Sequence, residues 1–340
     1  MEDEARRQAL RVMFLILGAE APSSRYRVLQ YLPYLREEGI EPVVHELEGG
    51  ETGRWVAIWR ARRFPVVFVQ KKLLTLPQWL GMRSGSPKLV FDFDDAIIYR
   101  DSAKGAGLSL GRLRRFRRIV RSCDLVIAGN SYLRGLAQED ARRLLTIPTP
   151  IDLRRYTQRG HGRRETLKIG WIGSRGTLFY LERLEGVLRD VCRRTAGVKV
   201  KVVSDAFPSW EGIPLECKHW SYEEEITDLH SFDIGIMPLT DDPWSRGKCG
   251  FKLLQYMAVG LPVVCSPVGV NGEIVRDGEN GLLARGPEQW ASCLHRLLRD
   301  GQMRSRLGES ARKTVKEGYA LEEWAGRMAR ALWEISGIPR

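Results

Sequence analysis

The chain has 340 residues, 43% of them hydrophobic, which is enough for two packed domains of about 150–170 residues each. Its formal net charge of +12 favours phosphate-bearing partners such as nucleotides, nucleic acids or lipid head groups. The six scattered cysteines argue against a disulfide framework or zinc site, and no apolar run approaches the ~18 residues of a membrane span.

Apolar segments alternate with helical segments along the first half of the chain. Residues 11–17 have the pattern of a buried strand, and a helix is expected over 24–38. Further strands are expected at 43–47, 65–69, 88–93, 124–128 and 144–147. Short strands buried on both faces and joined by helices indicate a parallel sheet. The charged stretch 1–11 is unlike a signal peptide, so we expect a cytoplasmic protein.

The polar segment 156–166 lacks apolar periodicity and is interpreted as a domain linker. The alternation then restarts, with strands expected at 167–173, 198–204, 215–220, 233–239 and 261–266. From 286 onwards the pattern is helical. A final apolar stripe is formed by Leu321, Trp324, Met328, Leu332 and Ile335. The sequence therefore predicts an α/β protein with two doubly wound domains, over 1–155 and 167–320.

The region after the strand at 233–239 holds the densest group of candidate ligand-binding residues. Ligands of open parallel sheets bind beyond the carboxyl ends of the strands. Gly247 and Gly250 would let a ligand approach the backbone at the start of a helix over 249–259. Lys248, Lys252 and Gln255 are expected on one face of that helix, where the lysines would neutralise a diphosphate. The alternative is an ordinary solvated helix face.

This region resembles the donor site of the retaining family-4 glycosyltransferases. The chain matches their pattern E-G-F-G-x-x-x-x-E-A-M-A-x-G-x-P-V-V with GKCGFKLLQYMAVGLPVV, and G-G-x-x-E-[IL]-[IV]-x-[DN]-G-x-x-G-[LF] with VGVNGEIVRDGENGLL. It also has IPTPIDLRRY where the family has P-N-G-V-D-x-x-x-F. The resemblance implies a GT-B fold, in which two Rossmann-like domains face each other across a cleft. It places the acceptor side in 1–155, the donor side in 167–320, and a helix in 321–340 able to cross back to the N-terminal domain.

The resemblance implies transfer of a hexose-type sugar from a nucleoside-diphosphate sugar to an acceptor hydroxyl, with retention and without cofactor or metal. The pathway would be glycan, polysaccharide or glycolipid synthesis. The expected donor-binding residues are Gly173, Ser174, Gly247, Cys249, Gly250, Gln255, Gly269, Val270, Asn271 and Glu273. The developing charge of the diphosphate would be stabilised by the helix N-terminus together with Arg175, Lys248 and Lys252.

The chain departs from the family pattern at several charged positions. Gly247 and Gln255 stand where the family has paired glutamates. Gln255 can still bind a ribose, because an amide both donates and accepts hydrogen bonds. Ser174 stands at the position of the family's arginine, with Arg175 next to it, and the family's lysine has no clear equivalent.

Two loops of the N-terminal domain carry acceptor-side candidates. The run DFDD places Asp92 and Asp94 at a strand end with Asp95 adjacent. It looks like the D-x-D metal motif of another glycosyltransferase fold, but the donor signature lies elsewhere, so no metal site is expected. Asp94, as a catalytic residue, or Asp95 would orient the acceptor hydroxyl, and a helix cap or turn is the alternative. The turn after the first strand adds Gly18, Ser24 and Arg25, for which turn chemistry is the alternative.

Residues 102–123 contain no acidic residue. The helix expected over 112–121 carries Arg112, Arg114, Arg115, Arg117, Arg118 and Arg121. Leu113, Phe116 and Val120 give it a narrow apolar stripe. Such a helix could lie on an anionic membrane and approach a lipid-linked acceptor, or be a solvated helix packed by its stripe.

Two other function classes stay open from the sequence. One is a sugar-nucleotide epimerase or hydrolase with the same architecture. The other is a non-catalytic nucleotide- or nucleic-acid-binding protein, which the missing glutamates favour. We expect no nucleic-acid partner, because the chain has no aromatic stacking array or known nucleic-acid motif.

Overall fold

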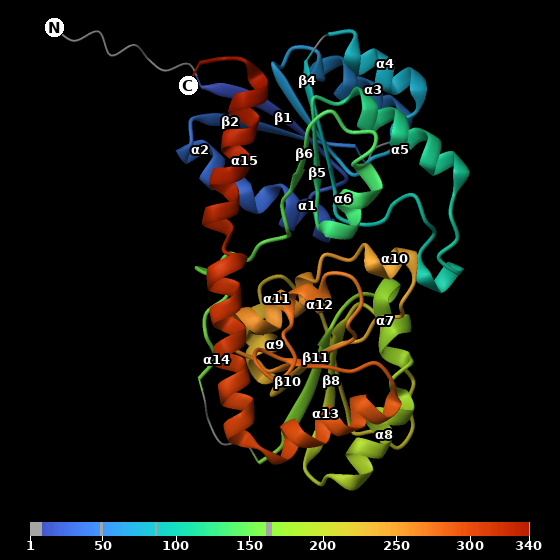
Figure 1. Ribbon diagram of the computed structural model, residues 1–340, viewed down its shortest axis with the longest axis vertical. Helices are drawn as coiled ribbons and strands as arrows, with labels where there is room; N and C mark the ends of the chain where they lie inside the picture. Colours follow the sequence, from blue (N-terminus) through green and yellow to red (C-terminus); the bar gives the residue numbers. More distant parts are fainter. Residues whose placement is uncertain (1–8, 48–49, 86, 161–164, 340) are drawn as a thin grey trace, which may run out of the picture. The chain divides into compact units, whose positions relative to one another are not determined.

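The computed structural model describes residues 9–47, 50–85, 87–160 and 165–339. The chain divides into two compact units. The first unit comprises Met1–Pro150, Gly247–Cys249 and Leu321–Arg340, and the second comprises Ile151–Arg246 and Gly250–Ala320. Each contains a six-stranded sheet with helices on both faces (Figure 1). Residues 1–8 of the charged N-terminal stretch and 161–164 of the expected linker lie outside the described residues.

The sheet of the first unit has the strand order β2-β1-β3-β4-β5-β6, with every pair parallel. Its strands are β1 (Leu10–Ile16), β2 (Ile40–Glu46), β3 (Val66–Gln70), β4 (Lys88–Phe93), β5 (Leu125–Ala128) and β6 (Leu144–Thr146). Successive side chains of a strand point to opposite faces. Met13 of β1 therefore belongs to one core cluster and Phe14 to the other, which explains why these strands are continuously apolar.

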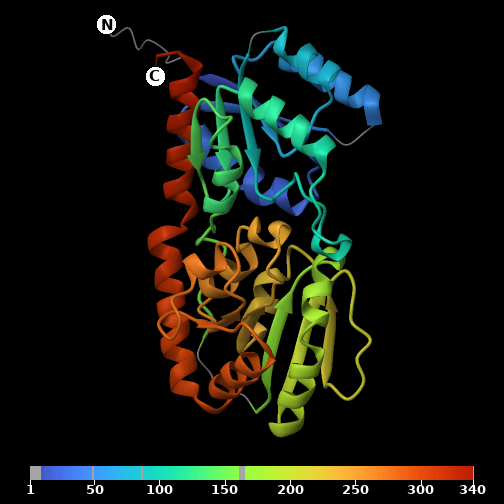
Figure 2. The same ribbon diagram turned by 45° about the vertical axis from the view of Figure 1, so that its right-hand side comes forward.

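Helices cover both faces of this sheet. One face packs against α3 (Gly50–Ala61), α4 (Leu76–Arg83), α5 (Leu110–Ser122) and α6 (Ser131–Ala137). The other packs against α2 (Leu32–Glu37) and α15 (Leu321–Ser336) (Figure 2). The stripe of α15 places Leu321, Met328 and Leu332 in this core, and Trp333 Nε1 donates a hydrogen bond to the carbonyl of Glu38 at 3.0 Å.

The prediction of a single helix over 24–38 is wrong. The chain forms α1 (Pro22–Arg27), a 3₁₀ turn (Leu29–Tyr31) and then α2. Val28 leaves the helical region, with φ −130° and ψ −63°. Pro33 in the first turn of α2 has no N–H to continue a hydrogen-bond ladder from α1.

The sheet of the second unit has the order β12-β11-β10-β7-β8-β9, again parallel throughout. Its strands are β7 (Leu167–Ile172), β8 (Val198–Ser204), β9 (Leu215–His219), β10 (Ile234–Met237), β11 (Val263–Cys265) and β12 (Leu282–Leu283). Its helices are α7 (Arg175–Glu182), α8 (Glu185–Arg194), α9 (Glu225–Ser231), α10 (Pro243–Arg246), α11 (Phe251–Ala258), α12 (Asn271–Ile274), α13 (Pro287–Arg299) and α14 (Gly301–Gly318).

These two units confirm the predicted class of two doubly wound, parallel α/β domains. The expected linker is too long at its start, because Tyr156 is buried in the core of the second unit. Arg159 is also held there, by an ion pair with Asp233 at 3.1 Å. None of the described helices is both long and apolar enough to cross a bilayer.

Candidate functional site

The loops after β7, β10 and β11 lie at the carboxyl edge of neighbouring strands in the second sheet. The first loop contains Gly173 and Ser174, and the third contains Gly269 and Val270. The loops after β10 and β11 touch, because a Cβ on Gly269 would lie only 2.4 Å from the carbonyl oxygen of Arg246. Gly269 also has φ +53°, where side chains are disfavoured. This edge is where a doubly wound domain binds its ligand.

The start of α7 has the features of an anion site. Arg175 is the first helical residue and its side chain is exposed. The preceding turn is fixed because Ser174 N donates to Thr177 Oγ1 at 3.0 Å. Gly173 leaves room for the ring of Trp171, which a Cβ would approach to 2.0 Å. The helix dipole favours an anion at such an N-terminus, and the N–H of Arg175 already donates to Asp205 Oδ1 at 2.5 Å.

Lys252 of α11 reaches this helix start. Its Nζ donates to Thr177 Oγ1 at 2.9 Å and lies 5.4 Å from the centroid of the Trp171 ring. The predicted catalytic residue Lys252 therefore reaches the first turn of the helix that begins with Arg175 and is preceded by the predicted donor-binding Ser174. Thr177, whose hydroxyl contacts both Lys252 and Ser174, was not identified from the sequence.

The expectation that Lys248, Lys252 and Gln255 share one helix face is wrong. The helix begins at Phe251 rather than at 249, because Gly250 at the N-cap is left-handed with φ +67° and turns the chain. Lys248 therefore precedes the helix. Gln255 is only 3% exposed, and its Nε2 donates to the hydroxyl of Tyr156 at 2.8 Å.

The hydrogen bonds of Gln255 belong to a buried network in the second unit. The hydroxyl of Tyr156 in turn donates to Glu225 Oε1 at 2.6 Å, and Trp220 Nε1 donates to Glu225 Oε2 at 3.0 Å. Tyr156 and Glu225 were missed from the sequence because they lie far from Gln255 along the chain. The network occupies the Nε2 atom of Gln255, the residue that was predicted to bind the ribose of the donor.

The residues after β11 include a buried oxygen atom that accepts no hydrogen bond from the described part of the chain. Asn271 is fully buried, and its Nδ2 donates to the carbonyl of Ser266 at 3.3 Å. Its Oδ1 has no hydrogen-bond partner within the described chain and would lie 3.4 Å from a Cβ on Gly250. A buried oxygen without a donor is costly, so it suits a ligand hydroxyl that approaches over Gly250. Val270 is buried and Glu273 is exposed.

A second group of charged residues lies at the carboxyl edge of the first sheet. Lys71 follows β3, and Asp94 and Asp95 follow β4. Lys71 Nζ lies 3.0 Å from Asp94 Oδ1 and also pairs with Asp95, while Lys248 Nζ donates to Asp95 Oδ1 at 2.9 Å. We call Lys71, Asp94, Asp95 and Lys248 the lysine–aspartate cluster. Lys71 was not identified from the sequence.

Charge pairing governs protonation in the lysine–aspartate cluster. Burial alone would raise the pKa of Asp95, but Lys248 and Lys71 hold that pKa well below its ordinary value. Burial alone would lower the pKa of Lys71, but Asp94 and Asp95 raise it above the ordinary range. Both groups are therefore charged at neutral pH.

The segment Gly247–Cys249 contacts the loops of the first unit. Asn130, the N-cap of α6, donates from Nδ2 to the carbonyls of Gly247 at 3.2 Å and Lys248 at 3.0 Å. Gly247 has no room for a side chain, because a Cβ would lie 2.6 Å from Ala96. The Cys249 thiol donates to the carbonyl of Asp94 at 3.2 Å. Its pKa is raised by burial and then by Asp94, so it stays a neutral thiol. Gly247 and Cys249 thus lie beside the predicted acceptor-side residues.

Asp92 has a structural role. It is fully buried in β4 and pairs with Arg27 of α1, whose Nε donates to Asp92 Oδ2 at 3.2 Å. Arg27 also donates to the carbonyls of Ile147 at 2.7 Å and Pro148 at 2.9 Å. Burial would lower the pKa of Arg27, but Asp92 raises it above its ordinary value. Burial also raises the pKa of Asp92, although the charge of Arg27 opposes this effect. Among the residues described, no three His, Cys, Asp or Glu side chains are grouped to hold a metal.

The turn after β1 is packed against β3. Ser24 is fully buried and donates to Gln70 Oε1 at 2.9 Å. Gly18 is buried and accepts a turn hydrogen bond from Ala21 at 3.1 Å, while Arg25 lies 3.3 Å from exposed Glu20. Turn and packing interactions account for the contacts of Ser24 and Gly18.

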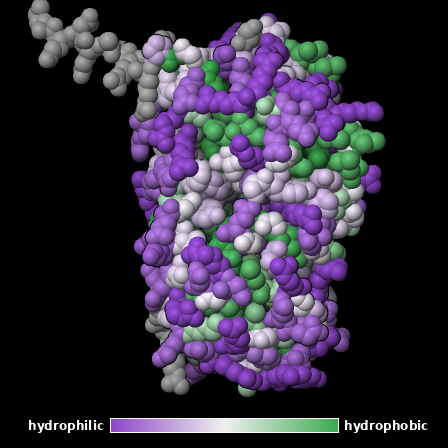
Figure 3. All heavy atoms as spheres, viewed as in Figure 1, coloured by the Kyte–Doolittle hydropathy of each residue, from purple (hydrophilic) through white to green (hydrophobic). Residues whose placement is uncertain are grey.

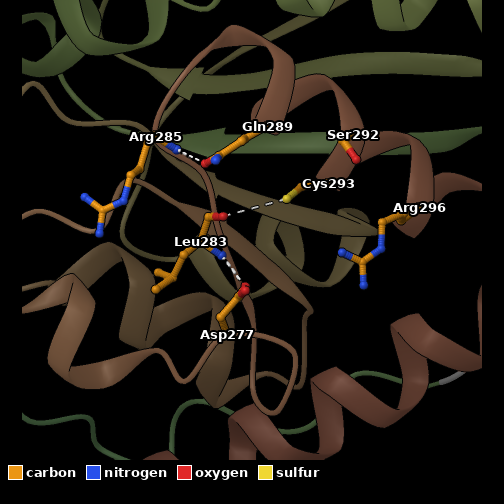
Figure 4. Close-up of a pocket in the computed structure, with 7 residues that line it drawn as sticks. All are labelled: Asp277, Leu283, Arg285, Gln289, Ser292, Cys293 and Arg296. Carbon is orange, nitrogen blue, oxygen red and sulfur yellow. Dashed lines mark hydrogen bonds between the residues drawn. The ribbon is translucent and has the colours of Figure 1, made fainter.

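A pocket of about 400 Å³ lies in the second unit between β12 and α13 (Figure 4). It is lined by Asp277, Leu283, Arg285, Gln289, Ser292, Cys293 and Arg296. Asp277 and Gln289 accept hydrogen bonds from the backbone N–H groups of Leu283 at 2.8 Å and Arg285 at 2.9 Å. A second cavity, of about 240 Å³, borders Pro238–Thr240 and Trp290. Neither contains a predicted site residue.

Residues 219–300 match the model of the family described as glycosyl transferases group 1. A D-inositol 3-phosphate glycosyltransferase of Nocardia farcinica is 24% identical over 252 residues, which cover 65% of this chain and 56% of that protein. The corresponding protein of Corynebacterium urealyticum is 32% identical over 119 residues, covering 34% and 27%. The chain thus spans between about a quarter and just over half of these relatives' length.

Solved structures share the fold over nearly the whole chain. Alr3699/HepE of Anabaena, in complex with UDP and glucose, has a TM-score of 0.75 at 14% identity and covers 96% of this chain and 100% of its own. Sucrose-phosphate synthase of Thermosynechococcus elongatus has a TM-score of 0.73 at 14% identity, covering 96% and 99%. The fold is therefore that of a GT-B protein, with two Rossmann-like domains. The comparisons support a relationship to the glycosyl transferases of group 1.

Proposed function

We propose that the chain is a retaining glycosyltransferase that moves a hexose-type sugar from a nucleoside diphosphate to an acceptor hydroxyl. The main support for this function is that Arg175 opens α7 and that Lys252 donates a hydrogen bond to Thr177 in the first turn of the same helix. Lys252 lies within the segment that matches the glycosyl transferases of group 1. Alr3699/HepE, which has the same fold, has been solved with UDP and with UDP-glucose.

The donor diphosphate is assigned to the start of α7. Two cations and the dipole of α7 neutralise its charge, so this task falls to the protein rather than to a metal ion. The Oδ1 of Asn271, which has no hydrogen-bond partner in the described chain, accepts a hydrogen bond from a hydroxyl of the donor. Asn271 thus makes the hydrogen bond to a donor hydroxyl that Gln255 was expected to make.

In the reaction, the bond between the anomeric carbon and the diphosphate oxygen breaks. The acceptor hydroxyl oxygen bonds to the same carbon on the same face, and the hydroxyl proton goes to the departing diphosphate. Arg175 and Lys252 stabilise the negative charge that grows on this leaving group. Asp95, with a strongly lowered pKa, is a poor proton acceptor, so we assign it the orientation of the acceptor hydroxyl.

A thermal-shift screen of UDP, GDP, ADP and TDP, with their sugar conjugates, tests this function. A true donor at one hundred times its dissociation constant adds about 2.7 kcal/mol to the stability of the protein. Incubation of that donor with candidate acceptors should then give a product whose anomeric configuration matches the donor's. An inverted product would remove the retaining assignment. Stabilisation by DNA, with no response to any nucleotide, would overturn the proposal.

A further inference from the structure

Large apolar side chains are exposed together on α3 and α4 of the first unit. Trp55 is 43% exposed and Trp59 54%, both on α3, while Leu76 is 48% exposed and Leu80 57%, both on α4. The two helices touch at this point, because a Cβ on Gly81 would meet the Trp55 ring at 3.1 Å. Figure 3 shows apolar side chains gathered over this corner of the molecule, at the upper right. We call these four residues the apolar patch.

Scattered exposed leucines are ordinary, but a group of tryptophans and leucines on adjoining helices marks an interaction surface. The patch is not explained by the candidate donor site, which belongs to the second unit. Arginines border it. Arg60 lies in the last turn of α3, Arg62 and Arg63 follow the helix, and the guanidinium of Arg63 lies 4.2 Å from the centroid of the Trp59 ring.

The arginine-rich helix α5 lies beside α3 and α4 in both ribbon views (Figures 1 and 2). Arg118 ties it to the turn before α4 by donating to the carbonyl of Leu74 at 2.9 Å. In its apolar stripe, Phe116 and Val120 are buried in the core and Leu113 packs against it. The stripe is therefore not available to a membrane. This excludes the interpretation in which α5 lies on a bilayer through its apolar stripe.

Burial of the stripe turns the arginines of α5 outward. Arg117 and Arg121 share the carboxylate of Asp140. Arg114 and Arg115 are exposed and have no ion-pair partner among the described residues. Residues 102–123 contain no acidic side chain to offset them. An apolar patch thus adjoins a cationic helix.

We infer that the apolar patch and the arginines of α5 form a docking surface for an anionic lipid bilayer. Tryptophan and leucine side chains enter the interfacial layer, where tryptophan is favoured, and the arginines contact lipid phosphates. Nucleic acid would use the arginines but leave the apolar patch unburied, and the unpaired arginines disfavour a second copy of this cationic surface. The inference rests on surface residues alone and does not depend on the proposed activity.

Vesicle sedimentation of the whole chain tests this surface. We expect binding to phosphatidylcholine vesicles that contain phosphatidylglycerol, weaker binding to phosphatidylcholine alone, and release as salt is raised. Removing two charges in Arg114→Ala/Arg115→Ala should weaken binding by about thirty-fold. The matched control is Arg193→Ala/Arg194→Ala on α8 of the second unit, whose side chains are 75% and 63% exposed. It removes the same charge and should have a much smaller effect.

The apolar contribution is tested with Trp59→Ser/Leu80→Ser, at exposed positions where the fold should be kept. This variant should bind at least tenfold more weakly. Brominated lipids should quench the tryptophan fluorescence of the parent and quench this variant less. Parent-like binding by both double variants would overturn the inference, as would equal binding to neutral and anionic vesicles. A dimer seen by light scattering for the parent and lost in Trp59→Ser/Leu80→Ser would assign the patch to a second copy instead.

Discussion

Lys248 and Lys252 lie four residues apart but are held by different partners, Asp95 and Thr177. If the diphosphate binds at the start of α7, Lys252→Ala removes a charge-assisted contact of about 1.5–3 kcal/mol. The affinity for the nucleoside diphosphate should then fall roughly tenfold or more, as measured by titration calorimetry.

Two lysines serve as controls for this measurement. Lys168, near the amino end of β7, pairs with Glu216 at 2.6 Å, so Lys168→Ala should leave nucleotide affinity close to that of the parent. Lys248→Ala should also affect nucleotide affinity less than Lys252→Ala, because it removes the ion pair to Asp95. A folded Lys252→Ala variant with parental affinity would exclude the start of α7 as the diphosphate site.

The lysine–aspartate cluster should make the free energy of unfolding depend on pH in the acidic range. The pKa of Asp95 is lower in the folded chain than its value of about 3.9 in the unfolded chain. Its contribution is therefore complete above that value and is lost as the pH falls through the folded pKa. Below about pH 4, urea unfolding should show a weaker pH dependence for Asp95→Asn than for the parent. Identical pH dependences would contradict the charged state assigned to Asp95.

We expect the buried Arg27–Asp92 pair to contribute to the free energy of unfolding. Both side chains are fully buried, so Asp92→Asn leaves a guanidinium without its counter-charge. Such a loss costs about 3–5 kcal/mol of unfolding free energy, which denaturant titration measures. Asp190→Asn, which removes an acid paired with exposed arginines on α8, should have little effect. Similar losses in the two variants would contradict a special role for the buried pair.

At the scale of elements, long apolar runs gave the strands of both sheets, because strands buried on both faces have few polar residues. β12 was missed because two residues carry no periodicity. The start of α11 was placed at 249 because only the backbone reveals that Gly250 is left-handed. The single helix predicted over 24–38 is interrupted at Val28 and Pro33. The apolar pattern of the sequence continues there, although the helical hydrogen bonds do not.

The partners of the predicted site residues were harder to predict than the residues themselves. Glycines and lysines after strands pointed to the second sheet edge, but Thr177, Asn130 and Lys71 were missed. Each contacts a residue distant in sequence, which parallel crossovers bring to the same edge. Lys71 and Asn130 also follow strands closely, so the rule that found Asp94 and Ser174 could have found them.

The start of α7 already has an anionic neighbour. The N–H of Arg175 donates to Asp205 Oδ1 at 2.5 Å, and a carboxylate there stabilises the helix. A diphosphate at the same helix end would be repelled by this charge. We therefore expect Asp205→Asn to bind the nucleoside diphosphate several-fold more tightly in calorimetry. Weaker binding would instead make Asp205 a ligand contact.

At the scale of the whole molecule, the proposed mechanism uses protein side chains to stabilise charge, and none of its steps requires a metal ion. Arg175 and Lys252 neutralise the donor, while Asp94 and Asp95 are engaged with Lys71 and Lys248. Transfer should therefore continue in the presence of EDTA, as measured by product formation. Loss of activity that manganese restores would reassign Asp94 and Asp95 to metal binding.

The place of α15 affects how the chain can fold as it leaves the ribosome. Leu321, Met328 and Leu332 cover one face of the first sheet, yet they are synthesised after every residue of the second unit. Domains generally fold in the order of synthesis. Here the second unit can complete its core first, while the nascent first sheet keeps an uncovered apolar face until α15 emerges. Chaperone capture of the nascent chain should therefore persist until the last helix has been translated.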